Sequence, residues 1–386
     1  MRDIQLLAAA PRPRRRGLLL RTAVMAAFLL SPATASAAIR NVEPAADPTA
    51  SATAPCTRTV GGFTASAVAS ARDRAGRGGI VCFPAGTYRG SLTASVPDQT
   101  WRLADAATVI GSVRITAAGV KFINGIIANP TTNRWIPSVE IRAHDVTVQS
   151  VMFRGGGTGI NVYGKDRSRI ISNSFRYQTG SAVSIWSEGV GADYTLIYMN
   201  SIVQSKTYRV SPITSRGNES SSHGGVQNYR SNIRLNSINQ GAGDIGWFGI
   251  ELKQSRGSII EKNSIKGGKV LVSLPETDGA RIRYNTFDLR GTPFWGIEVG
   301  NAHDAVIDAN TFVGDGPGGK DYAISLNSGS LRTLARSNKA TNLRTFFGVA
   351  GDGHRVTDNC LVNVRHVQEF MLNGGPNIVF ARNRGC

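Results

Sequence analysis

A short motif centred on asparagine recurs along the chain and limits what the chain can fold into. Six copies, each an Asn followed by Ser or Thr and then Ile or Phe, start at Asn173, Asn200, Asn236, Asn263, Asn285 and Asn310. Weaker copies start at Asn338, Asn359 and Asn383, and Asn124 and Gln149 take the same slot upstream. Most copies are about 25 residues apart, and such a repeat without helical periodicity is typical of a solenoid of strands.

Two apolar columns accompany the motif. One lies two residues after the asparagine, as at Phe175 and Ile202, and one lies three residues before it, as at Ile170 and Ile197. Such alternation predicts short strands. Because each strand pairs with its equivalent in the next coil, about 4.8 Å away, like residues stack. We therefore predict an all-β parallel β-helix, in which the asparagines hold tight turns and have no catalytic role.

The first 37 residues are predicted to be a signal peptide. Arginines precede an apolar run from Leu18 to Leu30, and Ala35-Ser36-Ala37 matches a cleavage site. The segment holds six of the 44 Lys+Arg and one of the 26 Asp+Glu, so its removal changes the net charge from +18 to +13. The run is too short for a membrane span, and the sequence leaves Sec or twin-arginine export open. Residues 38–55 are expected to be a flexible leader.

Composition and cysteines narrow the class of protein further. Hydrophobic residues make up 41% and charged residues 18%, which excludes a disordered chain and a membrane protein. In an exported protein, Cys56, Cys82, Cys360 and Cys386 predict two disulfides. Three pairings are possible, and we favour Cys56–Cys82 and Cys360–Cys386, one near each end. A zinc site is disfavoured, because the cysteines lack metal-binding spacing.

Residues Thr64 to Ala75 predict one amphipathic helix, suited to capping the N-terminal end of the core. It is followed by Gly79-Ile-Val-Cys-Phe-Pro-Ala-Gly-Thr-Tyr88. The Phe-Pro-Ala-Gly-Thr-Tyr phrase resembles the opening strand of the pectate-lyase-like right-handed parallel β-helix superfamily. With the asparagine repeat, the resemblance covers roughly residues 58–386. It implies a single-stranded right-handed parallel β-helix domain over residues 56–386, and we expect it to be a monomer.

Outward side chains of a β-helix can line a binding surface for a polymer. The phrases 247–253 (Trp-Phe-Gly-Ile-Glu-Leu-Lys) and 295–299 (Trp-Gly-Ile-Glu-Val) nearly repeat each other. They predict that Glu251 and Glu298 share one face, two coils and about 10 Å apart, with Lys253 beside Glu251.

The longest spacing between motifs, 36 residues, precedes Glu251. It predicts a loop that contains Arg209, Arg216 and His223, and such a loop is often a wall or a lid. The same alignment puts Gln227 and Tyr229 in the row before Glu251. Flat surfaces for sugar rings are predicted at Tyr163, Trp186, Trp247 and Trp295, and polar contacts at Asn301 and Asn327.

These residues favour a polysaccharide lyase that acts on an acidic, uronate-containing polymer by β-elimination. Lys253 is the predicted base, and His223 is a substitute base or the acid. Glu251 and Glu298 either hold a Ca²⁺ that bridges to the substrate or orient Lys253. Carboxylates of the substrate are predicted to bind arginines, namely Arg256, Arg281 and Arg283. The residual positive charge suits an acidic polymer.

Three alternatives stay open to different degrees. Two carboxylates at this separation also fit an inverting glycoside hydrolase, although the Asp-Asp and Gly-His-Gly motifs of polygalacturonases are absent from the sequence. The Arg-x-Pro-x-x-Arg phrase of classical pectate lyases is absent too, and the similarity to alginate and chondroitin-B lyases is partial. The second alternative is a glycan-binding protein without catalytic activity. Scattered basic residues and the export signal argue against nucleic acid.

Overall fold

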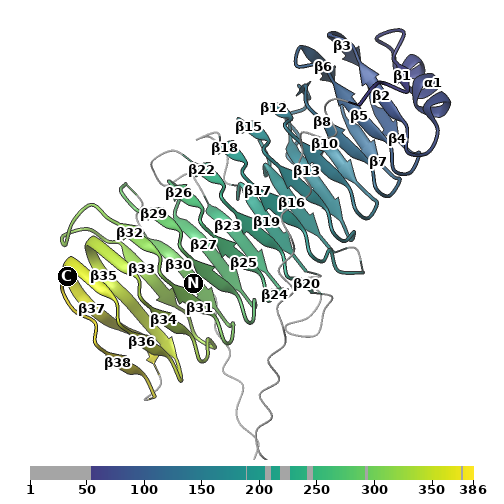
Figure 1. Ribbon diagram of the computed structural model, residues 1–386. Helices are drawn as coiled ribbons and strands as arrows, with labels where there is room; N and C mark the ends of the chain where they lie inside the picture. The colour runs from purple at the N-terminus through teal and green to yellow at the C-terminus, as the bar shows by residue number, and fades with distance from the viewer. Residues whose placement is uncertain are drawn as a thin grey trace, which may run out of the picture. The chain divides into compact units, whose positions relative to one another are not determined.

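Three faces of parallel strands wind into a right-handed β-helix of about 12 coils in the computed structural model (Figure 1). The structure describes residues 54–187, 189–204, 210–217, 227–240, 247–291, 294–374 and 377–386. The predicted signal peptide, nearly all of the predicted leader, Arg209 and His223 lie outside these residues. The predicted fold class is confirmed.

Each face is a stack of strands, one from each coil, and the three faces are named here by their strands. Face 1 is a 14-stranded sheet of β1 (Arg58–Thr59), β2 (Ile80–Phe83), β5 (Thr100–Leu103), β8 (Lys121–Ile123), β11 (Thr147–Gln149), β14 (Arg169–Ile171), β17 (Leu196–Tyr198), β21 (Asn232–Arg234), β25 (Ile259–Glu261), β28 (Arg281–Arg283), β31 (Val306–Asp308), β34 (Leu334–Arg336), β36 (Arg355–Thr357) and β38 (Val379–Ala381).

Face 2 follows face 1 in each coil. It consists of β3 (Gly86–Arg89), β6 (Ala107–Ile110), β9 (Ile126–Ile127), β12 (Met152–Arg154), β15 (Ser174–Arg176), β18 (Ser201–Val203), β22 (Ser237–Asn239), β26 (Ser264–Lys266), β29 (Thr286–Asp288) and β32 (Thr311–Val313).

Face 3 completes the coil with the longer strands. It consists of β4 (Leu92–Ala94), β7 (Val113–Ile115), β10 (Pro137–Ile141), β13 (Thr158–Tyr163), β16 (Val183–Trp186), β19 (Ile213–Arg216), β23 (Phe248–Lys253), β27 (Val270–Pro275), β30 (Trp295–Gly300) and β33 (Tyr322–Leu326). Two long strands, β35 (Lys339–Gly351) and β37 (Cys360–Gly374), run through faces 2 and 3. A separate pair joins β20 (Asn228–Tyr229) to β24 (Ser255–Arg256).

The predicted capping helix is α1 (Ala65–Ala75), at the N-terminal end of the core. Thr64 caps it, because its side-chain oxygen accepts a hydrogen bond from the Ala67 N–H at 3.2 Å. Val68 and Ala71 are buried against the first coil that the structure describes, so the helix covers apolar surface of that coil. Within the described residues this is the one helix, and its 11 residues are too few to cross a bilayer.

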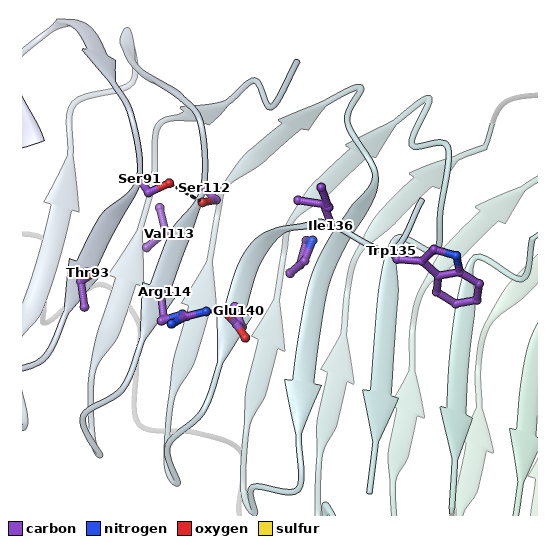
Figure 2. A pocket seen from close by; sticks show the side chains of 9 residues that line it. Ser91, Thr93, Ser112, Val113, Arg114, Trp135, Ile136 and Glu140 are labelled. Atoms are coloured by element: carbon purple, nitrogen blue, oxygen red, sulfur yellow. Dashed lines mark hydrogen bonds and ion pairs between the residues drawn. The ribbon is translucent and has the colours of Figure 1, made fainter. Parts of the chain in front are cut away.

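A loop over residues 128–136, between β9 and β10, passes over the next coils of face 3 (Figure 2). Gly180 lies beneath it, where a Cβ would collide with the Arg134 carbonyl oxygen. Thr158 Oγ1 donates a hydrogen bond to the same oxygen at 2.7 Å. The loop is therefore fixed to the strands below it, and it holds Trp135 above face 3.

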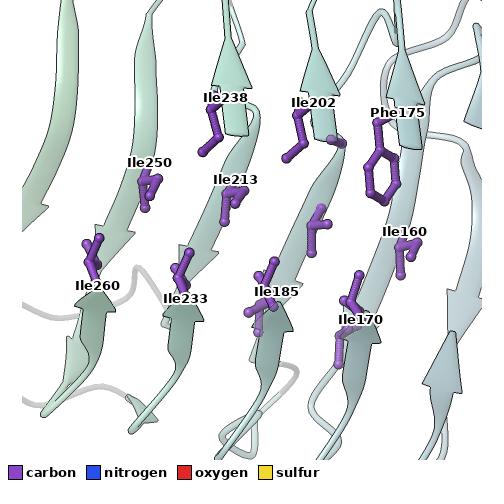
Figure 3. Packing of buried hydrophobic residues seen from close by; sticks show 14 of the residues in the cluster. Ile160, Ile170, Phe175, Ile185, Ile202, Ile213, Ile233, Ile238, Ile250 and Ile260 are labelled. Atoms are coloured by element: carbon purple, nitrogen blue, oxygen red, sulfur yellow. The ribbon is translucent and has the colours of Figure 1, made fainter. Parts of the chain in front are cut away.

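The core is a set of apolar ladders that point inward from all three faces. Figure 3 shows isoleucines such as Ile185, Ile202 and Ile233 converging from the three faces. Two pairs of rings in these ladders stack, Phe153 on Phe175 and Phe287 on Phe312, at centroid distances of 4.6 and 5.0 Å. The predicted apolar columns after and before the asparagines are thus the core.

The asparagine ladder connects face 1 to face 2 at one buried corner. Asn236 donates hydrogen bonds from its backbone N–H and from Nδ2 to Asn263 Oδ1, both at 2.9 Å. The same pattern continues from Asn173 to Asn383. The residue before each asparagine takes a left-handed conformation, as Tyr284 does at φ 57°. The side chains satisfy the backbone of these turns, as predicted.

The two upstream slots of the ladder were predicted wrongly. Register aligns Val151 and Gly125 with Asn173. Gln149 therefore lies two positions earlier, in β11, and Asn124 itself takes the left-handed turn at φ 64°. The ladder begins at Asn173, whose Oδ1 accepts from the Val151 N–H at 3.0 Å.

Both predicted disulfides are present. Cys56–Cys82 ties the segment before β1 to β2, and Cys360–Cys386 ties β37 to the C-terminus. Each closes a loop with a sequence separation of 26 residues. The covalent links therefore sit in the first and the last coil that the structure describes.

Candidate functional site

Two rows of outward side chains run along face 3. The carboxylate row holds, on consecutive strands, Glu140, Asn161, Ser184, Thr214, Glu251, Ser273, Glu298 and Ser325. The cation row, two residues further along each strand, holds Tyr163, Trp186, Arg216 and Lys253. Glu251 and Glu298 lie two rungs apart, about 10 Å, where the sequence alignment put them.

Glu251 is held by the preceding coil. The alternation in β23 turns Ile250 and Leu252 into the core and Glu251 outward, yet its carboxylate is almost fully covered. Arg216 Nη2 donates to both of its oxygens, at 3.1 and 3.0 Å, and Ser211 Oγ donates to Oε2 at 3.1 Å. Lys253, half-buried, is the register partner of Arg216. An arginine and a lysine thus stand side by side above a buried carboxylate.

Arg216 is the residue that sequence reasoning misplaced. The prediction assigned it to the long loop and put Gln227 and Tyr229 in the rows, whereas the structure puts Thr214 and Arg216 there. A usable signal existed, since Ile-Thr-Ser-Arg216 aligns with Ile-Glu-Leu-Lys253.

Glu298 belongs to a separate hydrogen-bonded group. Its carboxylate accepts from Ser273 Oγ at 2.8 Å and from Asn327 Nδ2 at 2.7 Å. Asn301 follows β30 in a left-handed conformation at φ 47° and is half-buried. The structure therefore joins Glu298 to the predicted Asn327, and not to Glu251.

The two glutamates do not fit a calcium site as they stand. Both oxygens of Glu251 accept from Arg216, and Ser273 separates the two carboxylates in the row. Calcium requires six to eight oxygen ligands around one point. Over the described ranges, no group of three or more His, Cys, Asp or Glu side chains is placed to hold a metal ion. The predicted calcium ligation stays a prediction.

Aromatic and cationic side chains extend the cation row toward the N-terminal coils. Trp186 Nε1 donates to Ser184 Oγ, and the Trp135 ring meets Trp186 edge-on at a centroid distance of 6.4 Å. The Arg142 guanidinium lies 4.3 Å from the centre of the Tyr163 ring. A cation is attracted to the aromatic face below it, so these pairs form a preorganised polar and aromatic surface.

The other predicted tryptophans lie at the opposite edge of face 3. Trp247, 44% exposed, directly precedes β23, and Trp295 begins β30. Phe294 packs near Trp295 at a centroid distance of 6.0 Å. Trp247 and Trp295 are four and three residues before the glutamates, hence about 10 Å or more from the cation row.

The predicted substrate arginines are not brought to the rows. Arg281 and Arg283 lie on β28 of face 1, where Arg283 forms an ion pair with Glu261 at 2.8 Å. Arg256 is exposed on β24, paired with Tyr229. A substrate on face 3 would meet Arg216 and Lys253 instead. Where His223 lies relative to them is outside the described residues.

Comparison with solved structures shows the fold. The chain is similar to the Streptococcus pneumoniae surface protein and adhesin PfbA, with a TM-score of 0.53, 15% identity, and coverage of 82% of this chain and 96% of PfbA. It is also similar to a PL6 alginate lyase in complex with a trisaccharide, with a TM-score of 0.55, and to alginate lyase AlyF-OU02 with G6, with a TM-score of 0.52. Each lyase is 15% identical, and 82% of this chain and 85% of that lyase are covered.

These likenesses place the chain among right-handed parallel β-helix proteins, as the sequence resemblance predicted. No family model matches the chain. No curated protein matches it either.

Proposed function

We propose that the protein is an exported polysaccharide lyase that binds an acidic polysaccharide along face 3 and cleaves it by β-elimination. The observation that carries the proposal is the register of Trp186, Arg216 and Lys253 on three consecutive strands. It puts a flat surface, a guanidinium and an amine within about 10 Å, as the reaction requires.

The chemistry assigns one role to each group. The Arg216 guanidinium, positioned by Glu251, neutralises the uronate carboxylate and stabilises charge that builds on the adjacent carbon. Lys253 Nζ accepts the proton from that carbon, the electron pair forms a carbon–carbon double bond, and the bond to the leaving oxygen breaks. An acid returns a proton to that oxygen, and His223 is the predicted candidate.

Several observations support a polysaccharide partner. Two of the similar structures are alginate lyases, one with a trisaccharide and one with G6. The net charge of +13 that remains once the predicted signal peptide is removed, and the two disulfides, suit an exported protein that meets an acidic polymer.

Glycan binding without cleavage is the second candidate, and one observation favours it. PfbA, a surface adhesin, has a similar fold. An inverting hydrolase receives less support, because it needs two available carboxylates with a water between them, and Glu251 and Glu298 are both engaged in hydrogen bonds.

One assay separates these functions. The protein, purified after export, is incubated with alginate, polygalacturonate and glycosaminoglycans, with and without EDTA. A rise in ultraviolet absorbance from an unsaturated uronate supports the lyase. New reducing ends without that absorbance support a hydrolase, and retention on the polymer with neither signal supports binding alone.

A further inference from the structure

A cavity of about 370 Å³ lies on face 3 near its N-terminal end, away from Lys253 (Figure 2). Its floor comes from Thr93, Arg114 and Glu140, which are aligned on the consecutive strands β4, β7 and β10. The hydroxyls of Ser91 and Ser112 meet at its edge, 3.1 Å apart. Floor and edge together therefore offer three hydroxyls, one guanidinium and one carboxylate.

The wall of the cavity is apolar and held in place. Trp135 and Ile136 line it and are 60% and 45% exposed. The loop that carries them is fixed by the hydrogen bond from Thr158 to Arg134 and by one from Trp135 N–H to Asn133 Oδ1 at 3.1 Å. Figure 2 shows Ile136 between the floor residues and Trp135, whose ring meets Trp186, so Ile136 is the apolar side chain of the wall nearest the floor.

An ion-pair chain connects this cavity to the cation row. Glu140 accepts from Arg114 Nε at 2.6 Å and from Arg142 Nε at 2.5 Å, and Arg142 covers Tyr163. Burial raises the pKa of Glu140, but the hydrogen bonds from Arg142 and Arg114 outweigh it and hold the pKa below its usual value. Because two arginines share one carboxylate, the ion-pair chain keeps a net positive charge.

We propose that this cavity is a remote subsite that binds one sugar unit of the acidic polysaccharide, through apolar contact with Ile136, hydroxyl contacts to Thr93, and a carboxylate contact to Arg114. The inference rests on the proposed function and deepens it. Five rungs separate Arg114 from Glu251, which is about 24 Å along the axis. A polymer that fills both sites gains affinity over a short oligosaccharide that fills the cation row alone.

The test compares ligand lengths in a variant that fills the cavity. Thr93→Phe occupies the cavity from an exposed position, and Thr286→Phe, at an exposed threonine of face 2, is its matched control. Both are made in the Lys253→Ala background to prevent turnover. Calorimetry with ladders of alginate and polygalacturonate oligosaccharides, from dimer to dodecamer, gives the dissociation constants.

We expect Thr93→Phe to weaken binding of the longest oligosaccharides about tenfold and to leave tetramer affinity unchanged, whereas Thr286→Phe changes neither. Equal affinities of Thr93→Phe and Thr286→Phe for the longest ligand would overturn the subsite, even if tetramers bind. If neither ladder binds any variant, the proposed function falls, and the subsite with it.

Discussion

Arg216 donates hydrogen bonds to both carboxylate oxygens of Glu251 on the neighbouring strand, at 3.1 and 3.0 Å. Only 6% of Glu251 is exposed, so the carboxylate depends on this partner. The pair holds the guanidinium beside Lys253, and it assigns Glu251 a positioning role in the proposed reaction.

Removing the Arg216 guanidinium should destabilise the fold, because the Glu251 carboxylate stays buried. Arg216→Gln is expected to lower the free energy of unfolding by about 3 kcal/mol, because it leaves Glu251 buried without its charge partner. Urea denaturation measures this. The double variant Arg216→Gln/Glu251→Gln should recover part of the loss, and a double variant no more stable than the single one would show that the pair is not coupled.

Trp186 should matter for polymer binding more than the tryptophans at the opposite edge. Trp186→Ala is expected to weaken binding about fivefold, from lost ring stacking, whereas Trp186→Phe keeps most of the affinity. Affinity electrophoresis in alginate gives the dissociation constants. Trp295→Ala is the control, and a larger loss there would move the polymer away from the cation row.

An interior asparagine of the ladder should contribute more to the free energy of unfolding than the terminal one does. Asn263 Oδ1 accepts two hydrogen bonds from Asn236, and its Nδ2 donates to Ile233 O and Asn285 Oδ1. Asn263→Ala leaves these buried groups unsatisfied and should cost about 3 kcal/mol, measured by urea denaturation. Asn383→Ala, at a partly exposed end, should cost about 1 kcal/mol. Equal costs would contradict the ladder's role in the core.

Stability should fall below about pH 6.5 because of His354. The ring is fully buried, and its Nδ1 accepts from the Thr333 N–H at 3.1 Å, so Nε2 carries the hydrogen toward Ala350 O. Burial lowers the pKa of His354 below 6.5, although Ala350 and Asp352 oppose the shift. The unfolded chain therefore takes up a proton that the folded one excludes, and stability is lost as the pH falls.

The expected slope is up to about 1.4 kcal/mol per pH unit between pH 6.5 and 5. Chemical denaturation at several pH values measures it, and His354→Asn, which keeps an acceptor but does not titrate, should flatten it. Carboxylates with lowered pKa, such as Asp145 beside Arg167, lose their contribution only nearer pH 4. An unchanged slope in His354→Asn would assign the effect to another group.

The sequence predicted the repeating architecture better than the site. Isoleucine and asparagine columns are visible in one dimension because each coil repeats the same inward pattern, and the same alignment placed Glu251 and Glu298 correctly. Arg216 was missed because the 36-residue spacing hides where the face 3 strand resumes. Upstream of Asn173 the ladder position is taken by Val151 and Gly125 instead of asparagine, so the slots were misaligned.

The prediction that placed arginines at the site missed for a different reason. A three-faced coil turns outward side chains in three directions, and sequence proximity does not tell them apart. Arg281 and Arg283 lie four and two residues before Asn285, on the strand that precedes the ladder turn, which assigns them to face 1. The ion-pair chain through Glu140 was not foreseen, because Arg114 lies one coil before Glu140 and Arg142.

The most direct test of the account is the turnover of an acidic polysaccharide by the Lys253→Ala variant. Wild-type protein should release unsaturated uronate, and Lys253→Ala should reduce kcat at least a hundredfold while its melting temperature and its dissociation constant for the polymer change little. Lys320→Ala, at an exposed lysine outside both rows, should match the wild type. An active Lys253→Ala variant, on a polymer that the wild type cleaves, would contradict the assignment of the base.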